Sequence, residues 1–126
     1  MTQTARQLER YLATIRAIAR SPDVREYIVG YTSNVTNRQA AYRGVKMPHL
    51  VVLAAEMLQD DALDLESALQ TAIKDGDKRS LLFRKYNGPR ISRPNARSRG
   101  AKRLPVGDRS SAVYVAWAAE LSALAE

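Results

Sequence analysis

The sequence predicts a small α/β domain in which a short mixed sheet of about three strands is packed by helices. Two apolar segments of strand length, 26–31 and 49–54, are each followed by a segment with helical character. A chain of 126 residues fits one domain with a single modest core. The expected parts are an N-terminal helix over 1–21, a core over 26–90, a basic loop over 90–109 and a C-terminal segment over 110–126.

The first helix and the first strand follow from the apolar pattern. Across residues 4–20, Leu8, Leu12 and Ile15 repeat at helical spacing, and Pro22 ends the helix. The strand over 26–31 is rich in β-branched and aromatic residues. Gly30 interrupts it, which often marks a bulge or a close approach of the backbone.

A second helix is expected over residues 35–43. Thr32, Ser33 and Asn34 precede it, and each can cap a helix N-terminus. Arg38 and Tyr42 are four residues apart, so they share one face of this helix. A strand that leads into a short helix bearing an arginine and a tyrosine is a compact way to build a phosphate site.

The segment 49–54 is a continuous apolar run, which predicts a strand covered on both faces. His49 lies at its start, where a structural or hydrogen-bonding role is the default and catalysis is the other option. Residues 60–74 then form a helix with acids in the first turn and Lys74 in the last.

Glu66 falls inside the apolar stripe of this last helix. A buried carboxylate must find a cation or a metal ion, or shift its pKa. Arg38 is the obvious candidate partner. A structural Glu–Arg pair and a functional carboxylate are both compatible with the spacing.

Two later segments have an ambiguous period. Residues 80–86 read as a third strand or as a short helical turn, followed by a turn at 86–89. Residues 113–117 alternate like a strand, yet Val113, Trp117 and Leu121 also form a helical stripe. The simpler expectation is a C-terminal helix.

The spacing of Gly30, Thr32, Asn34 and Arg38 is G-x-T-x-N-x-x-x-R, with Tyr42 one turn later. This pattern resembles the second half of the GIY-YIG nuclease motif, although Ile28 stands where that motif usually has tyrosine. Residues of the 60–74 helix add to the resemblance, which covers about residues 27–90: Ala62, Glu66 and Leu69 match A-x-x-x-E-x-x-L.

The resemblance implies a metal-dependent phosphodiesterase. Arg38 would be catalytic, and Glu66 would bind Mg²⁺ or Mn²⁺. A tyrosine would bring the attacking water or act as its base, and a base would need a lowered pKa. The candidate tyrosines are Tyr27, Tyr31, Tyr42 and Tyr114, and the supporting residues are Gly30, Asn34 and Asn87.

A permuted arrangement is a further hypothesis. The sequence SAVYVAW near the C-terminus resembles the first, "GIY" strand of the family, with Tyr114 as its tyrosine. If this segment paired beside residues 27–32, the domain would be a permuted GIY-YIG fold.

The charge pattern favours a nucleic-acid partner, DNA more than RNA. Net charge is +7 and the pI is about 10.1. Residues 78–109 hold eleven basic side chains and one acid, Asp108, so the excess positive charge is local. The predicted nucleic-acid contacts are Arg84, Lys85, Arg90, Arg93, Arg97, Arg99, Lys102 and Arg103.

Other functions are excluded by composition. The absence of cysteine removes thiol nucleophiles and cysteine-ligated zinc, and it fits a cytoplasmic location. A single histidine excludes a histidine-rich metal site. No apolar run approaches a membrane span, so no membrane partner is expected. The prediction is nucleic-acid binding with metal-dependent cleavage. The alternatives are a non-catalytic DNA- or RNA-binding module and a protein-interaction subunit with a basic loop.

Overall fold

The computed structural model describes residues 3–43, 47–86 and 102–119. Within these residues the elements, in chain order, are α1 (Gln3–Arg20), β1 (Glu26–Thr32), α2 (Val35–Arg43), β2 (His49–Met57), α3 (Gln59–Lys74), α4 (Leu81–Arg84) and β3 (Ser111–Ala118). The mixed α/β class and the first five of these elements agree with the sequence prediction, with boundaries shifted by a few residues at most.

The sheet has three antiparallel strands in the order β1-β3-β2, so the last strand of the chain is the central one. Gly30 of β1 lies opposite Tyr114 of β3, and Val29 lies opposite Val115. The expected helix through 113–117 is therefore wrong. These residues form a strand, as the alternating pattern of the segment allowed, because β3 pairs on both edges and its residues are almost all buried.

Residues 80–86 supply a helical turn rather than the third strand. The Ser80 side chain accepts a hydrogen bond from the Phe83 backbone N–H at 3.2 Å, which caps α4. After α4, Tyr86 forms an isolated parallel bridge with Tyr27. Apart from this bridge, the predicted mixed sheet is an antiparallel one.

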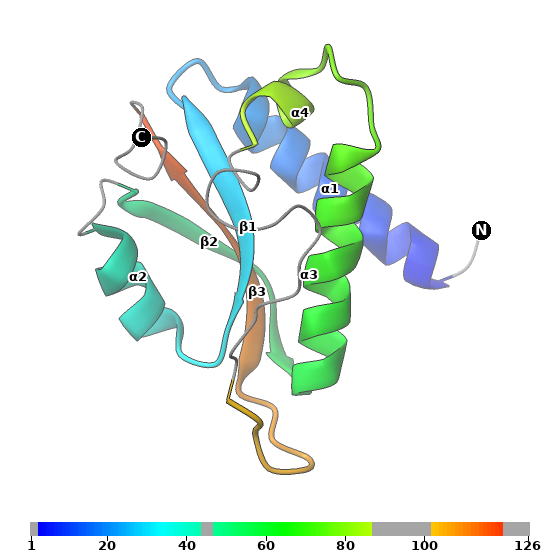
Figure 1. The fold of residues 1–126 in the computed structure, drawn as a ribbon, viewed down its shortest axis with the longest axis vertical. Helices are drawn as coiled ribbons and strands as arrows, with labels where there is room; N and C mark the ends of the chain where they lie inside the picture. Colours follow the sequence, from blue (N-terminus) through cyan, green and yellow to red (C-terminus); the bar gives the residue numbers. More distant parts are fainter. Residues whose placement is uncertain (1–2, 44–46, 87–101, 120–126) are drawn as a thin grey trace.

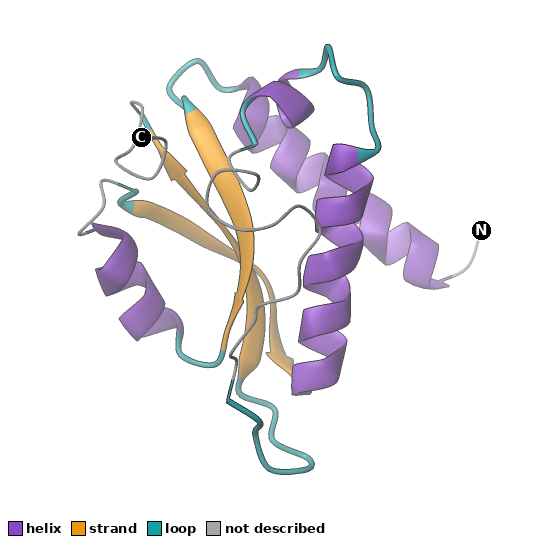
Figure 2. Cartoon of the chain, in the orientation of Figure 1, coloured by secondary structure: helices purple, strands orange, loops and turns teal. Residues whose placement is uncertain are grey.

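Helices cover both faces of the sheet (Figures 1 and 2). One face packs against α1, α3 and α4, and α2 lies over the other. The alternation of each strand divides the core accordingly. Tyr27 and Val115 belong to the larger cluster with α1 and α3, whereas Ile28 and Tyr114 pack with Met47 on the α2 side.

The prediction that residues 49–54 are covered on both faces is wrong. β2 is an edge strand, in which Val51 and Val52 are each 38% exposed. The pairing with β3 shifts register twice along β2, and Glu56 has a φ of 54° near its end. An apolar run alone does not distinguish an edge strand from a buried one, because the difference lies in how many neighbours the strand has.

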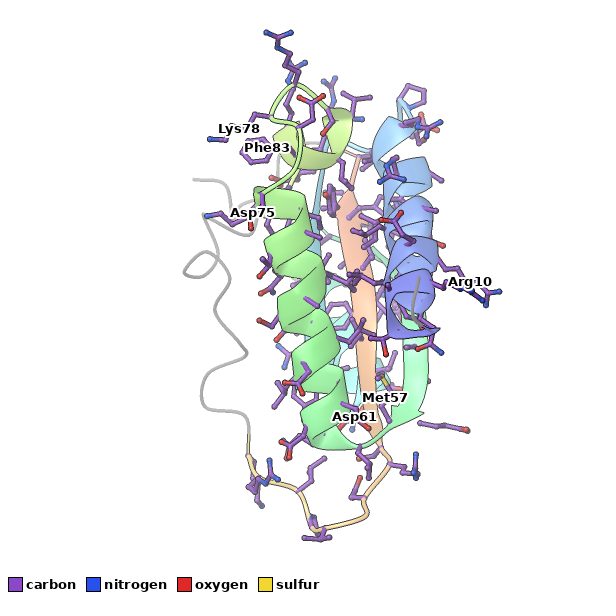
Figure 3. The ribbon with its side chains drawn as sticks, turned by 90° about the vertical axis from the view of Figure 1, so that its right-hand side faces the viewer. Arg10, Met57, Asp61, Asp75, Lys78 and Phe83 are labelled. Carbon is purple, nitrogen blue, oxygen red and sulfur yellow. The ribbon has the colours of Figure 1, made fainter. Side chains whose placement is uncertain are left out.

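The layer formed by α1 and α3 is seen face-on in Figure 3. Asp61 and Met57 lie at the end where β2 passes into α3, and Asp75 and Lys78 lie at the opposite end. Among the described residues, no helix has the length and apolarity needed to cross a bilayer.

Candidate nucleic-acid and metal site

The site is built around a close approach between two strands. The Tyr114 ring lies across Gly30, so a Cβ placed on Gly30 would be 2.6 Å from Tyr114 Cζ. Glycine is required there because any side chain would occupy the space of the ring. Gly30, predicted as a bulge or a close approach, therefore marks the point where β1 admits the side chain of its neighbour.

Tyr114 meets Tyr42 of α2 at this point. The two hydroxyl oxygens are 2.8 Å apart, and the rings are tilted with centroids 5.8 Å apart. Tyr114 is buried and Tyr42 is half-buried. The pair therefore joins the central strand to the helix that carries Arg38.

Two opposite charges act on this tyrosine pair. Arg38, exposed on α2, is near enough for its charge to lower the pKa values of both phenols. Glu66 of α3, 2% exposed, acts in the opposite sense on both. Arg38 and Tyr42 of α2 and Tyr114 of β3 therefore lie on one side of the sheet, whereas Glu66 belongs to α3 on the other side and acts on the pair through its charge.

Gln70 follows Glu66 by one turn of α3 and is also buried. Its Nε2 donates a hydrogen bond to the carbonyl oxygen of Val29 at 3.2 Å. Its Oε1 is buried and has no hydrogen-bond partner within the described part of the chain. Two side-chain groups with oxygen atoms that can ligate a metal ion, a carboxylate and an amide, therefore share this face of α3 near β1.

Burial is the main cause of the tyrosine pKa shifts. It raises the pKa of the Tyr42 phenol, although the hydrogen bond with Tyr114 and the charge of Arg38 lower it. Burial also raises the pKa of Tyr114, as do the charge of a nearby Tyr42 phenolate and the hydrogen bond with it. Both phenols are consequently protonated at neutral pH, so they act as hydrogen-bonding hydroxyls and not as phenolate bases.

We expect the free energy of unfolding to fall as pH rises above about 10. Burial is the first cause of a raised pKa for Tyr27, Tyr42, Tyr86 and Tyr114. Above pH ~10 the unfolded chain loses these protons while the folded chain keeps them, which favours unfolding by about 1.4 kcal/mol per pH unit for each tyrosine. Urea unfolding between about pH 9 and 11 measures the slope, and Tyr42→Phe should make it shallower. An unfolding free energy that stays constant over this range would contradict the assignment.

The other two candidate tyrosines belong to the core. Tyr27 is fully buried, and its hydroxyl donates a hydrogen bond to the carbonyl oxygen of Leu82. The Tyr31 hydroxyl accepts a hydrogen bond from Gln59 Nε2 at 3.0 Å. Both rings lie in the cluster shared with α1 and α3, and these bonds indicate a structural role.

Asn34 has a structural role too, as the capping residues suggested. Its Oδ1 accepts a hydrogen bond from the Asn37 backbone N–H at 3.0 Å, and its own N–H donates to Thr32 Oγ1 at 3.0 Å. These contacts fix the direction in which α2 leaves β1, and hence the position of Arg38. Asn87 lies outside the described residues.

The predicted basic contacts divide into two groups. Arg90, Arg93, Arg97 and Arg99 lie outside the described residues. Among the others, Arg84 and Lys102 are exposed. Lys85 Nζ donates a hydrogen bond to the Ser21 carbonyl oxygen at 3.0 Å. The Arg103 guanidinium donates to both carboxylate oxygens of Asp60, at 2.6 and 3.0 Å. The Arg103–Asp60 pair is solvent-exposed and contributes little to stability.

The described residues on either side of 87–101 are held by hydrogen bonds to β1 and α3. Before it, the carbonyl oxygen of Lys85 accepts a hydrogen bond from the Tyr27 N–H at 3.0 Å. After it, Gln59 Nε2 donates a hydrogen bond to the Lys102 carbonyl oxygen at 2.8 Å. Gln59 Oε1 accepts one from the Leu104 backbone N–H at 2.9 Å. Since Gln59 also contacts Tyr31, these hydrogen bonds lie at the two ends of β1, the strand that contains Gly30.

Sequence reasoning missed Tyr86 and Gln59. Burial is the larger cause of the raised pKa of the half-buried Tyr86, and the charge of Glu66 is the second. Glu66 therefore acts on Tyr86 as well as on the Tyr42–Tyr114 pair. The position of Tyr86 directly before the predicted turn asparagine was the available signal. Nothing in the local sequence pointed to Gln59, whose contacts join residues distant in the chain. Comparison with protein-family models, with curated proteins and with solved structures gave no match.

Proposed function

We propose that this protein binds nucleic acid and cleaves phosphodiester bonds with a divalent metal ion, on a permuted GIY-YIG-like scaffold. The observation that carries the proposal is the Tyr42–Tyr114 hydroxyl pair at 2.8 Å, set over Gly30 and subject to the charges of Arg38 and Glu66. Positive charge for a phosphate, a carboxylate for a cation and hydroxyls for a water are the components that such a reaction needs.

The strand order supports the permuted version. In the resemblance, a strand with the first tyrosine should precede β1. Here β3 follows all the other elements, pairs antiparallel with β1 and presents Tyr114 opposite Gly30. The pairing of β3 with β1 in space takes the place of adjacency in the chain, as the permuted arrangement requires.

The donor set near Glu66 fits a hard divalent cation. Mg²⁺ takes oxygen ligands, often only one or two from the protein, and completes its coordination with water and substrate phosphate. Glu66 supplies a carboxylate, and the buried Gln70 Oε1 supplies an amide oxygen one turn away. No group of three acidic or histidine side chains suited to a metal occurs among the described residues. This cation site would therefore depend on bound phosphate.

Each side chain has a distinct role in the proposed reaction. Mg²⁺ or Mn²⁺ at Glu66 would polarise the scissile phosphate and stabilise the leaving oxygen. Arg38 stabilises the negative charge that develops on the phosphorane oxygens. Tyr42 and Tyr114, protonated at neutral pH, orient the attacking water by hydrogen bonding. Arg84, Lys102 and the basic residues of 87–101 hold the nucleic-acid backbone.

A non-catalytic binding module is the second candidate, and two observations favour it. Glu66 is only 2% exposed, so a hydrated cation reaches it only if neighbouring side chains move. The pKa values of Tyr42 and Tyr114 are raised, whereas a phenolate base would need the reverse. In this version Glu66 is a structural carboxylate, and the basic segment alone provides affinity.

Cleavage of plasmid and short-duplex DNA by the wild-type protein tests the proposal. We expect cleavage with Mg²⁺ or Mn²⁺, none with EDTA, and binding that weakens steeply with salt. Each phosphate contact contributes about −0.9 to the slope of log K against log salt. Tight, salt-dependent binding without cleavage in either metal would leave only the binding module. A slope near zero would refute the basic segment as the binding surface.

A further inference from the structure

A second aromatic feature lies at the end of the sheet away from Gly30. His49, the first residue of β2, stacks on Trp117 of β3 with ring centroids 5.3 Å apart and planes inclined by 21°. His49 is exposed and Trp117 is half-buried, so the stack presents aromatic surface to solvent. The two residues are also cross-strand partners, which accounts for their contact but not for their exposure.

The stack forms one wall of a depression of about 370 Å³. Ile18 and Val24 contribute apolar surface, and Ser21 and Asp23 contribute polar groups. The Ser21 hydroxyl oxygen accepts a hydrogen bond from the Asp23 backbone N–H at 3.3 Å, and a hydroxyl can also donate one. An aromatic wall with a carboxylate and a hydroxyl beside it suits a planar ring that carries hydrogen-bond donors.

Basic residues flank the lining residues of this depression, in contact or in sequence. Lys85 Nζ lies 3.0 Å from the Ser21 carbonyl oxygen, and the Arg25 N–H donates to the Ala118 carbonyl oxygen at 2.8 Å. The Arg25 side chain is exposed, as is that of Arg20, which precedes Ser21. The Lys85 ammonium group beside Ser21 would therefore place positive charge near a phosphate attached to a ring bound against the stack.

We infer that the depression bounded by His49 and Trp117 binds an unpaired nucleobase, so that the preferred ligand is single-stranded nucleic acid or a duplex with an extruded base. The inference rests on the proposed function and specifies its substrate class. Bases of an intact duplex are stacked on one another and cannot enter, whereas exposed bases stack on aromatic side chains. Trp117 is three residues from Tyr114 along β3, about 10 Å, and faces the other side of the sheet.

Trp117 is the sole tryptophan, so its fluorescence reports on this depression alone. The test titrates the protein in EDTA with a short labelled single strand and with the matching blunt duplex, following label anisotropy and tryptophan emission. We expect the single strand to quench Trp117 and to bind more tightly than the duplex. His49→Ala should weaken single-strand binding on the order of tenfold, the factor for one lost base-stacking contact. His49→Tyr, which keeps a planar ring, should retain affinity.

Val52→Ala is the matched control, since Val52 is exposed on the same strand and lies outside the depression. Single-strand binding with constant Trp117 emission, or with unchanged affinity in His49→Ala, would overturn the inference and leave the proposed function standing. Absence of binding to either probe at low salt would overturn both. Quenching by a protein that never cleaves DNA would support the base site and refute the nuclease.

Discussion

Glu66→Gln and Arg38→Ala are each expected to reduce DNA cleavage by about 10²–10³-fold while binding persists. This factor is typical for the loss of one group that stabilises charge in a transition state. Glutamine keeps the shape of the buried side chain but removes the negative charge that a cation needs. Arg38 is exposed, so its truncation to alanine opens no cavity in the core. Initial rates of plasmid nicking with Mg²⁺ and with Mn²⁺ measure both effects.

Two exposed residues of the same helices are the matched controls. Asp64→Asn removes an acid two positions from Glu66, and Arg43→Ala removes an arginine from the last turn of α2. Both should cleave within a few-fold of the wild-type rate. Folding is checked by circular dichroism in every variant. If Glu66→Gln folds and cleaves normally, Glu66 is not the cation ligand, and if it fails to fold, Glu66→Asp supplies the comparison.

Local patterns predicted α1 and α3 well because each of these two helices buries one apolar stripe. Residues 4–20 and 60–74 fold as α1 and α3, and Glu66 is buried as its place in the apolar stripe indicated. The cap at Asn34 also followed from local chemistry. Periodicity and capping involve residues within a few positions of one another, so one sequence contains all the information they need.

Strand partnership was less predictable because it depends on distant residues. Val113 and Trp117 fit a helical stripe and a strand equally well, and only pairing with β1 and β2 decides between them. For the same reason β2 was placed in the interior although it is an edge. The candidate site was hard to predict for the same reason, because it also depends on strand pairing. Arg38 and Tyr42 could be paired from helix geometry, but the contact of Tyr114 with Gly30 required knowledge of the register.

Gly30→Ala is expected to lower the free energy of unfolding by about 1–3 kcal/mol, the usual cost of an added methyl in a packed site. The new Cβ would lie 2.6 Å from Tyr114 Cζ, so the ring must move. Tyr114 is 2% exposed and hydrogen-bonded to Tyr42, which leaves little room for the ring to move. Displacing it separates the hydroxyl pair, so cleavage should fall together with stability. Urea unfolding and nicking rates measure the two effects.

A double-mutant cycle separates the steric cause from a general effect of alanine in a strand. Tyr114→Leu removes the atoms that the new Cβ would meet, so its combination with Gly30→Ala should be more stable than the sum of the single changes implies. Gly76→Ala is the comparison, because its Cβ would lie 3.1 Å from the Ala72 carbonyl oxygen, away from the tyrosine pair. Additive effects in the cycle would mean that Tyr114 does not occupy the space over Gly30. The hydroxyl pair would then lose the contact that fixes its position relative to Arg38, and with it the main support for a catalytic site.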